Sequence, residues 1–160
     1  MSEALQNLNV NLSEQAELYN KLLTLEEKKQ KALIKNVIQE IELITAQEER
    51  FIIQVNRLEK ERSMWAEQIG RELGKPPEDL TLAELAEHFP ALEEVRLSLD
   101  QVVLRLKTVH ESNSQLLQQA MKIVDYTVGL LTHQASNTYT YPGQREKEEN
   151  KKRHLMDWRI

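Results

Sequence analysis

The chain of 160 residues contains no cysteine, which excludes disulfides and thiolate sites. It has only four glycines, four prolines and 5% aromatic residues, against 29% charged residues, a composition typical of an elongated all-α protein. No apolar run approaches the roughly 20 residues that span a bilayer. The amino-terminal stretch also lacks the basic and apolar regions of a signal peptide. We therefore expect a cytoplasmic protein with no membrane insertion.

Charge and motif content narrow the expected function. Acidic residues outnumber basic ones by 26 to 21, which gives a net charge of −5 and a pI near 5.5. Such a balance disfavours bulk binding to nucleic acid or to an anionic membrane. The sequence contains neither a glycine-rich phosphate loop nor a nucleophile motif. These observations favour an interaction protein over an enzyme.

Carboxylates and histidines are the remaining candidates for a metal or acid–base site. Glu84, Glu87 and His88 fall on one short predicted helix and resemble helical di-metal ligands in part. A di-iron bundle needs Glu-x-x-His on two helices, and this spacing does not occur in the sequence. His110 lies on an apolar stripe without an identifiable acid–base partner, so we interpret it as a structural histidine. We expect no metal site, no cofactor and no catalytic residue.

Apolar periodicity predicts a first helix over residues 3–34. The apolar positions recur mostly at steps of three or four: Leu5, Leu8, Leu12, Leu18 or Tyr19, Leu22, Leu25, Ala32 and Leu33. Asn36 followed by Gln39 matches a capping box, which predicts a second helix over residues 36–73. One continuous helix through Lys35 is the alternative.

The second helix carries a heptad-like seam with two charged interruptions. Its positions alternate in steps of three and four: Ile41, Ile44, Glu48, Phe51, Val55, Leu58, Arg62, Trp65 and Ile69. Gly74 suits the left-handed residue that ends a helix. In the connector, residues 74–90, Thr81 and Glu84 match a second capping box, and Pro90 ends the short helix that they start.

The third helix, predicted over residues 91–132, has the widest apolar face. One line of positions alternates in steps of three and four: Leu99, Val102, Leu106, Val109, Asn113, Leu116, Ala120, Ile123, Thr127 and Leu130. A second line runs beside it at steps of seven: Val103, His110, Leu117, Val124 and Leu131. Two lines exceed what a two-stranded seam needs, so this helix contacts either two neighbours or one neighbour and a partner protein.

These elements predict an all-α fold, an elongated antiparallel coiled-coil-like bundle of three helices over residues 1–134. A flexible tail is expected over residues 135–160, because Pro142 and Gly143 are followed by the charged run "REKEENKKR". The apolar terminus from Leu155 to Ile160 either folds back onto the bundle or takes part in binding. The sequence leaves this choice open.

Helix lengths also indicate uncovered apolar surface. If the first two helices form a hairpin, the third helix, roughly 60 Å long, overhangs it. Exposed apolar surface of that size marks a partner site, and an amphipathic helix would fit it. Simple core packing of the stripe is the alternative. Asn113 is either a polar residue of the core or its edge, or a hydrogen-bonding residue for a bound segment.

Two stretches resemble the FlgN family of flagellar export chaperones. Residues 28–62 resemble the family's N-terminal hairpin, with its "AL", a break, paired glutamates and an "LE..R" ending, here Ala32–Leu33, Glu48–Glu49 and Leu58–Glu59 with Arg62. Residues 111–131 resemble its C-terminal helix, which often carries an Asn followed by "LL". Beyond that helix, Tyr139 and Gly143 match the family spacing of a tyrosine, three residues and a glycine.

The resemblance implies a three-helix chaperone of the flagellar type III secretion system. Its implied partners are the C-terminal helical segments of hook–filament junction proteins and the cytoplasmic domain of the export gate. The implied client-binding residues are Asn113, Leu116, Leu117, Ala120, Ile123, Val124, Leu130 and Leu131. Tyr139 and Gly143 would form the element that docks on the export gate.

Two questions remain open at this level. A structural coiled-coil or adaptor protein of another bacterial assembly would use the same apolar seams. Wide apolar stripes also suit either a monomer or a homodimer, and the preferred junction protein has no signature in the sequence.

Overall fold

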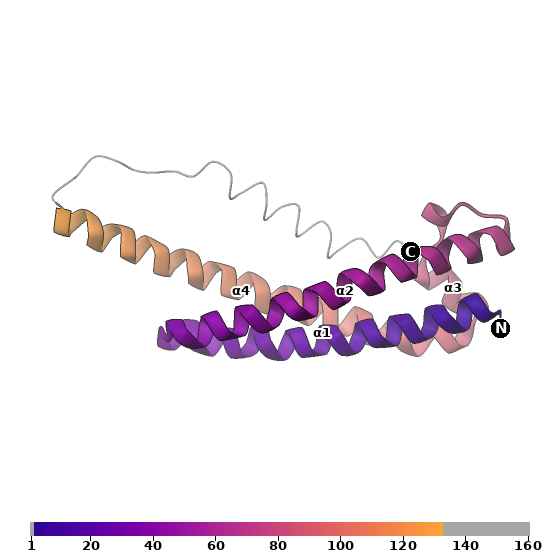
Figure 1. The fold of residues 1–160 in the computed structure, drawn as a ribbon, viewed down its shortest axis with the longest axis horizontal. Helices are drawn as coiled ribbons and strands as arrows, with labels where there is room; N and C mark the ends of the chain where they lie inside the picture. The colour runs from indigo at the N-terminus through magenta and orange to yellow at the C-terminus, as the bar shows by residue number, and fades with distance from the viewer. Residues whose placement is uncertain (1, 133–160) are drawn as a thin grey trace.

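The computed structural model describes residues 2–132, which are mostly helical and contain no strand (Figure 1). The all-α prediction is confirmed for this part of the chain. The elements are α1 (Glu3–Lys35), α2 (Ile38–Leu73), η1 (Pro77–Asp79), α3 (Leu82–His88), η2 (Pro90–Leu92) and α4 (Glu93–Thr132), where η denotes a 3₁₀ turn. The predicted tail lies outside the described residues. None of the helices within residues 2–132 is long and apolar enough to cross a membrane.

The turn between α1 and α2 differs from the prediction at Asn36. This residue adopts a left-handed conformation (φ 56°), and its backbone N–H donates to the carbonyls of Ala32 and Leu33. Asn36 therefore closes α1, and its assignment as the N-cap of the second helix was wrong. The residue that precedes α2 is Val37, which makes no side-chain capping bond. Asparagine is common at helix N-caps, and it also tolerates the left-handed backbone region better than most residues. It can therefore begin one helix or close the preceding one.

The connector after α2 follows its local signals more closely. Gly74 is left-handed (φ 66°) and caps α2 through its backbone N–H to the Gly70 carbonyl. The Thr81 hydroxyl accepts the backbone N–H of Glu84 at 3.2 Å, as in a capping box. The Glu84 carboxylate, however, pairs with Lys75 instead of reaching back to the cap. Half of the predicted capping box is thus present.

α1 lies between the two other long helices. α2 runs antiparallel to it, and α4 runs in the same direction as α1 after α3 and the two 3₁₀ turns reverse the chain near the N-terminus (Figure 1). α1 packs extensively on both α2 and α4, whereas contacts between α2 and α4 are sparse. The fold is therefore an antiparallel hairpin with α4 laid along α1, not a bundle in which each helix packs equally on the other two.

One apolar core joins the three long helices and the connector. Leu8 and Leu12 of α1, Leu58 of α2, Leu85 of α3 and Leu99 of α4 are almost fully buried in it. Burial of each such side chain contributes about 1.5–3 kcal/mol. The core thereby holds α4 along α1 over the first part of α4.

Buried amides add specific contacts between α1 and α2. Asn11 Nδ2 donates to the Leu58 carbonyl at 2.9 Å, and Gln15 Nε2 donates to Asn11 Oδ1 at 2.8 Å. Arg62, one of the two charged positions in the predicted seam, approaches Gln15 with Nη1 at 3.5 Å from Oε1. These polar contacts suit only one register of the two helices.

Candidate functional site

The C-terminal part of α4 extends beyond the hairpin (Figure 1). Gln30, near the end of α1, donates to the Ser112 hydroxyl at 3.0 Å. α1 ends soon afterwards at Lys35, whereas α4 continues to Thr132. We call residues 116–132 the overhang. At 1.5 Å per residue the overhang is about 25 Å long.

The overhang exposes most of its large apolar side chains. They have relative exposures between 48% and 77%: Leu117, Met121, Ile123, Val124, Tyr126, Val128, Leu130 and Leu131. Leu116 and Ala120 are half-buried. An exposed apolar face of this kind on one helix is a candidate interaction site.

The exposed face of the overhang continues the buried face of the same helix. Val102 and Val103, one on each predicted line, are buried against the hairpin. Three and four heptads later the same lines carry Ile123, Val124 and Leu131, which are exposed. The residue types do not change along the lines, but within residues 2–132 no helix covers them beyond the hairpin. The overhang therefore presents a core-like surface that no helix of the described chain covers.

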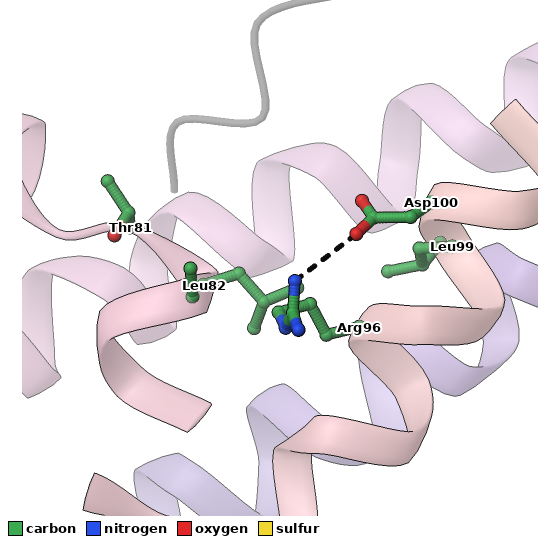
Figure 2. A pocket seen from close by; sticks show the side chains of 6 residues that line it. Thr81, Leu82, Arg96, Leu99 and Asp100 are labelled. Atoms are coloured by element: carbon green, nitrogen blue, oxygen red, sulfur yellow. Dashed lines mark hydrogen bonds and ion pairs between the residues drawn. The ribbon is translucent and has the colours of Figure 1, made fainter. Parts of the chain in front are cut away.

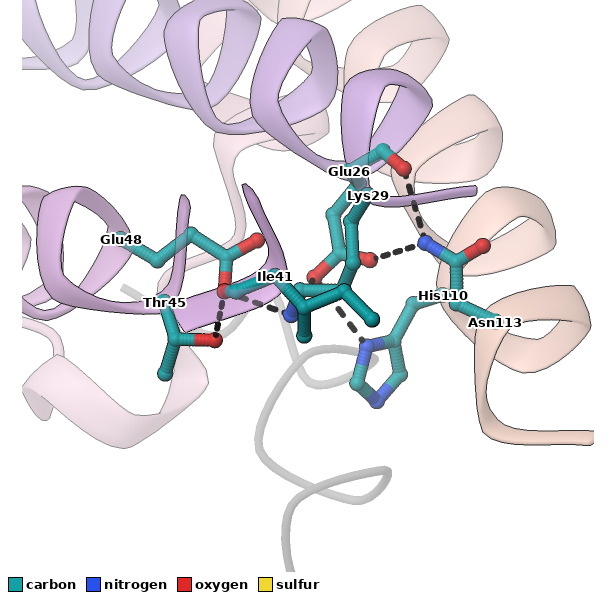
Figure 3. A network of polar contacts seen from close by, with 7 residues as sticks. All are labelled: Glu26, Lys29, Ile41, Thr45, Glu48, His110 and Asn113. Carbon is teal, nitrogen blue, oxygen red and sulfur yellow. Dashed lines mark hydrogen bonds and ion pairs between the residues drawn. The ribbon is translucent and has the colours of Figure 1, made fainter. Parts of the chain in front are cut away.

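A cluster of polar residues lies where α4 leaves the hairpin. It comprises Glu26 and Lys29 of α1, Glu48 of α2, and His110 and Asn113 of α4 (Figure 3). Asn113 Nδ2 donates to the Glu26 carbonyl at 2.8 Å and to Glu26 Oε2 at 2.6 Å. Lys29 Nζ donates to Glu48 Oε2 at 2.7 Å. We call these five residues the polar junction, because they tie all three long helices together.

Electrostatics in the polar junction centre on Glu26. Its burial acts to raise the pKa of the carboxyl, but His110, Asn113 and the charge of Lys29 outweigh burial and lower the pKa to about 2. For Glu48, burial dominates and raises the pKa, although Lys29 opposes it. His110 Nδ1 stands 3.6 Å from Glu26 Oε1. The junction is an ion-pair network held by one shared lysine.

The side chain of Asn113 is thus already hydrogen-bonded within the chain. Its side chain is buried at 3% exposure, and its amide donates to Glu26. This placement is that of a polar core residue, one of the two roles that the sequence left open for it. The exposed apolar residues of the overhang begin beyond it, at Leu117.

Comparison with known proteins identifies the family of this long-helix chain. The family model FlgN, described as FlgN protein, matches residues 1–147. The chain belongs to the FlgN family. FlgN proteins are chaperones of flagellar type III export. The FlgN match includes all four α-helices and ends before residues 148–160. No curated protein and no solved structure gives a significant match to the chain.

A depression beside the connector lies between α3 and α4 in the described part of this FlgN-family chain (Figure 2). Its volume is about 120 Å³, and Leu82, Arg96, Leu99 and Asp100 are among its lining residues. Arg96 is engaged on both sides, by Glu93 at 2.6 Å and by Asp100 at 3.3 Å. Sites for small-molecule ligands are usually about 300–1,000 Å³. The depression is too small for such a ligand, and its one cation is already paired.

The residues considered for a metal site lie apart from any ligand cluster. Glu84, Glu87 and His88 are on α3, where Glu84 pairs with Lys75. Within residues 2–132, no three carboxylate or histidine side chains are close enough together to hold a metal ion. His110 belongs to the polar junction, so its contact with Glu26 gives it a structural setting.

Some positions of interest were not predicted, and others lie outside the described residues. Val128 joins the exposed face of the overhang although it lies on neither predicted line. Glu26 was also missed, because a carboxylate beside Leu25 looks like an ordinary solvated position in sequence. Tyr139 and Gly143 lie outside the described residues, so their predicted role stays a prediction.

Proposed function

We propose that this chain is a cytoplasmic chaperone that binds the C-terminal helical segments of hook–filament junction proteins. Binding would prevent premature assembly of these proteins until the chaperone delivers them to the flagellar export apparatus. Membership of the FlgN family supports export-chaperone activity. The observation that carries the proposal is the overhang, an apolar face that lacks a covering helix within the described part of the chain.

An amphipathic helix is the partner that fits the overhang best. The face is one helix long and follows the same steps of three and four that α1 covers upstream. A client helix of about five turns would span its 25 Å. Such a helix would dock its own apolar face as α1 does. The clients' terminal helices must later pack against neighbouring subunits, so covering them in the meantime prevents premature contacts.

The proposed contact residues are the exposed and half-buried members of the predicted set. They are Leu116, Leu117, Ala120, Ile123, Val124, Leu130 and Leu131. Asn113 is placed at the inner border of this surface, because its amide already binds Glu26. Each large apolar side chain that becomes fully buried would contribute about 1.5–3 kcal/mol before the cost of association.

Co-purification with the C-terminal segment of a junction protein tests this surface. The double variant Leu117→Asp with Val124→Asp places two charges on the apolar face and should lower affinity at least tenfold, because a buried unpaired charge costs several kcal/mol. The control is Gln115→Asp with Gln118→Asp, two exposed polar positions on the same helix. The control should bind normally. Wild-type 1:1 binding by the Leu117/Val124 variant would reject the surface.

We further propose that Tyr139 and Gly143 dock the loaded chaperone on the export gate. The support is their spacing, which resembles that of the family tyrosine and glycine. Tyr139→Ala should leave client affinity unchanged while weakening binding to the cytoplasmic domain of the gate and reducing motility. Tyr141→Ala, two residues away, is the matched control. Normal swimming by the Tyr139 variant would remove this role.

A further inference from the structure

We infer that the apolar C-terminus of this chain, residues 154–160 ("HLMDWRI"), docks on the overhang of its own α4 while no partner is bound. The juxtaposition of an uncovered apolar face and an apolar segment at the end of the same chain points to this contact. Self-docking does not depend on the identity of the client. Only its consequence for client affinity rests on the proposed function.

The overhang combines a large exposed apolar area with little charge. Its exposed side chains include Ile123 at 67%, Leu130 at 59% and Leu131 at 77%. Charged residues on the overhang are limited to Lys122 and Asp125. A face with so much apolar area and so little charge attracts any apolar segment in reach, including one from its own chain.

The C-terminal segment supplies the matching chemistry. Leu155, Met156, Trp158 and Ile160 make four of its seven residues large and apolar. The preceding run from Arg145 to Arg153 is highly charged, so the apolar residues are concentrated at the very end of this sequence. The family match stops at residue 147, so this apolar end belongs to the part of the chain that the family model does not describe.

The link between the two is long enough for the chain to reverse. Residues 133–154 separate α4 from Leu155, and such a link extends to roughly 75 Å. That is about three times the 25 Å of the overhang. A link of this length gives an effective concentration of the segment at the overhang on the order of millimolar. Weak affinity between segment and overhang is therefore enough to keep the face largely covered.

Self-docking would make access to the apolar face depend on whether the C-terminal segment is bound to it. The tail covers the overhang until a client helix with a larger apolar face displaces it. The apparent dissociation constant for a client then rises as the fraction of uncovered chains falls. The same contact would limit association between overhangs of two copies.

Tryptophan fluorescence tests the contact directly in the full chain. The protein has two tryptophans, so Trp65→Phe leaves Trp158 as the sole indole. Trp65 lies partly buried against the core, and phenylalanine keeps its aromatic packing. We expect Trp158 to emit at shorter wavelength than in the urea-unfolded protein. In this background, Val124→Asp with Leu131→Asp should move the emission to longer wavelength.

The matched control for that experiment is Gln115→Asp with Gln118→Asp, which adds the same charge on the polar side of α4. It should leave the emission of Trp158 unchanged, and circular dichroism should show equal helix content in both variants. Emission that is already solvent-like in the parent, or an equal response to both variants, overturns the inference. A wavelength that depends on protein concentration identifies a second copy as the occupant and also overturns it.

A second arm separates this inference from the proposed function. A chain that ends after Gln144 retains Tyr139 and Gly143 but lacks the apolar terminus. The full-length variant Trp158→Ser with Ile160→Ser keeps the length of the chain but replaces two of its four large apolar terminal residues with serine. Both should bind a junction-protein segment severalfold more tightly than the wild type. Equal client affinity of the wild type, the shortened chain and the serine variant would show that the C-terminus does not compete with the client. Absence of client binding in every form rejects the proposed client, while the fluorescence result still decides self-docking.

Discussion

Asn113 occupies the last buried position of α4 before the overhang begins. Its amide donates to both the backbone and the carboxylate of Glu26, so one side chain fixes where α4 lies along α1. A hydrophobic residue at this position would pack in more than one register, whereas the amide satisfies Glu26 in one. The residue therefore stabilises the relative placement of the two helices.

Replacing this amide has a defined cost. Asn113→Ala should lower the free energy of unfolding by about 2 kcal/mol, because the buried Glu26 carboxylate loses a donor. Urea denaturation of the purified protein measures it. Gln119→Ala, at an exposed position on the same helix, is the control and should change stability by no more than about 0.5 kcal/mol. Loss of client binding without loss of stability would instead support a direct role in the client surface.

The polar junction also predicts a dependence on pH. The Glu26 pKa is about 2 in the folded protein against an ordinary value of 4.5, so the folded state binds this proton less tightly than the unfolded state. Its contribution to stability is therefore fully present above pH 4.5 and is lost as pH falls toward 2. After allowance for solvent screening the contribution is on the order of 2 kcal/mol.

Glu26→Gln isolates that contribution from those of other carboxylates. The variant should lose less stability than the wild type between pH 5 and pH 3 in urea denaturation. Glu17→Gln, a change at an exposed position of α1, is the control and should follow the wild type. An identical pH dependence in wild type and Glu26→Gln would show that the carboxylate does not have a lowered pKa.

At the scale of the elements, the two ends of α2 show how local signals compete. Gly74 ends the helix as its sequence predicts, because glycine adopts the left-handed conformation at little cost. Asn36 is compatible with starting α2 or closing α1, and the structure uses it to close α1. A short polar residue between two helices therefore identifies the turn but not which helix it caps.

Two glycines in these helices should respond oppositely to the same substitution. A Cβ added at Gly70 would lie 2.7 Å from the Lys75 carbonyl oxygen, a backbone atom that cannot easily move. Gly70→Ala should therefore destabilise the protein by about 1–3 kcal/mol. Gly129, inside α4, faces open space, so Gly129→Ala should increase helix stability by about 0.5–1 kcal/mol.

Thermal unfolding followed by circular dichroism compares the two variants with the wild type. The Gly70 variant should melt at a lower temperature, and the Gly129 variant should melt at the same or a higher one. A stable Gly70→Ala protein would mean that the connector after α2 can shift away from Gly70. Such a result would contradict the close approach of Lys75 to that glycine.

For the whole molecule, the structure separates a stable hairpin from a projecting helix. The core lies among α1, α2, the connector and the first part of α4, while the overhang adds little burial. This division assigns the buried core to one part of the described chain and the exposed apolar face to the other. Regions with few buried contacts are also those that open most easily, which suits the partner exchange that we propose for this surface.

Removing residues 119–160 tests this division. The shortened chain should keep its free energy of unfolding within about 1 kcal/mol of the full-length value, because the removed overhang residues are mostly exposed. It should also lose client binding. Urea denaturation and co-purification with a junction-protein segment measure the two properties. A loss of several kcal/mol would show that the overhang supports the core.

Much of the fold could be predicted because its signals are local. Steps of three and four residues set the faces of the helices, and Gly74 and Pro90 end two of them. The expectation of an overhang also came from helix lengths, since Lys35 ends α1 well before α4 ends. The exposed line from Leu117 to Leu131 could be predicted in the same way.

The sequence by itself determined the helices, their apolar faces and the unequal lengths that leave part of one face uncovered. Only the tertiary structure decided that α1 lies between α2 and α4, that Asn36 closes α1, and that Glu26 is the partner of Asn113. The physical reason is the distance along the chain over which each kind of signal acts. Periodicity and chain-breaking residues act within a few turns, whereas Glu26 and Asn113 meet only after the connector has reversed the chain and α4 has packed along α1.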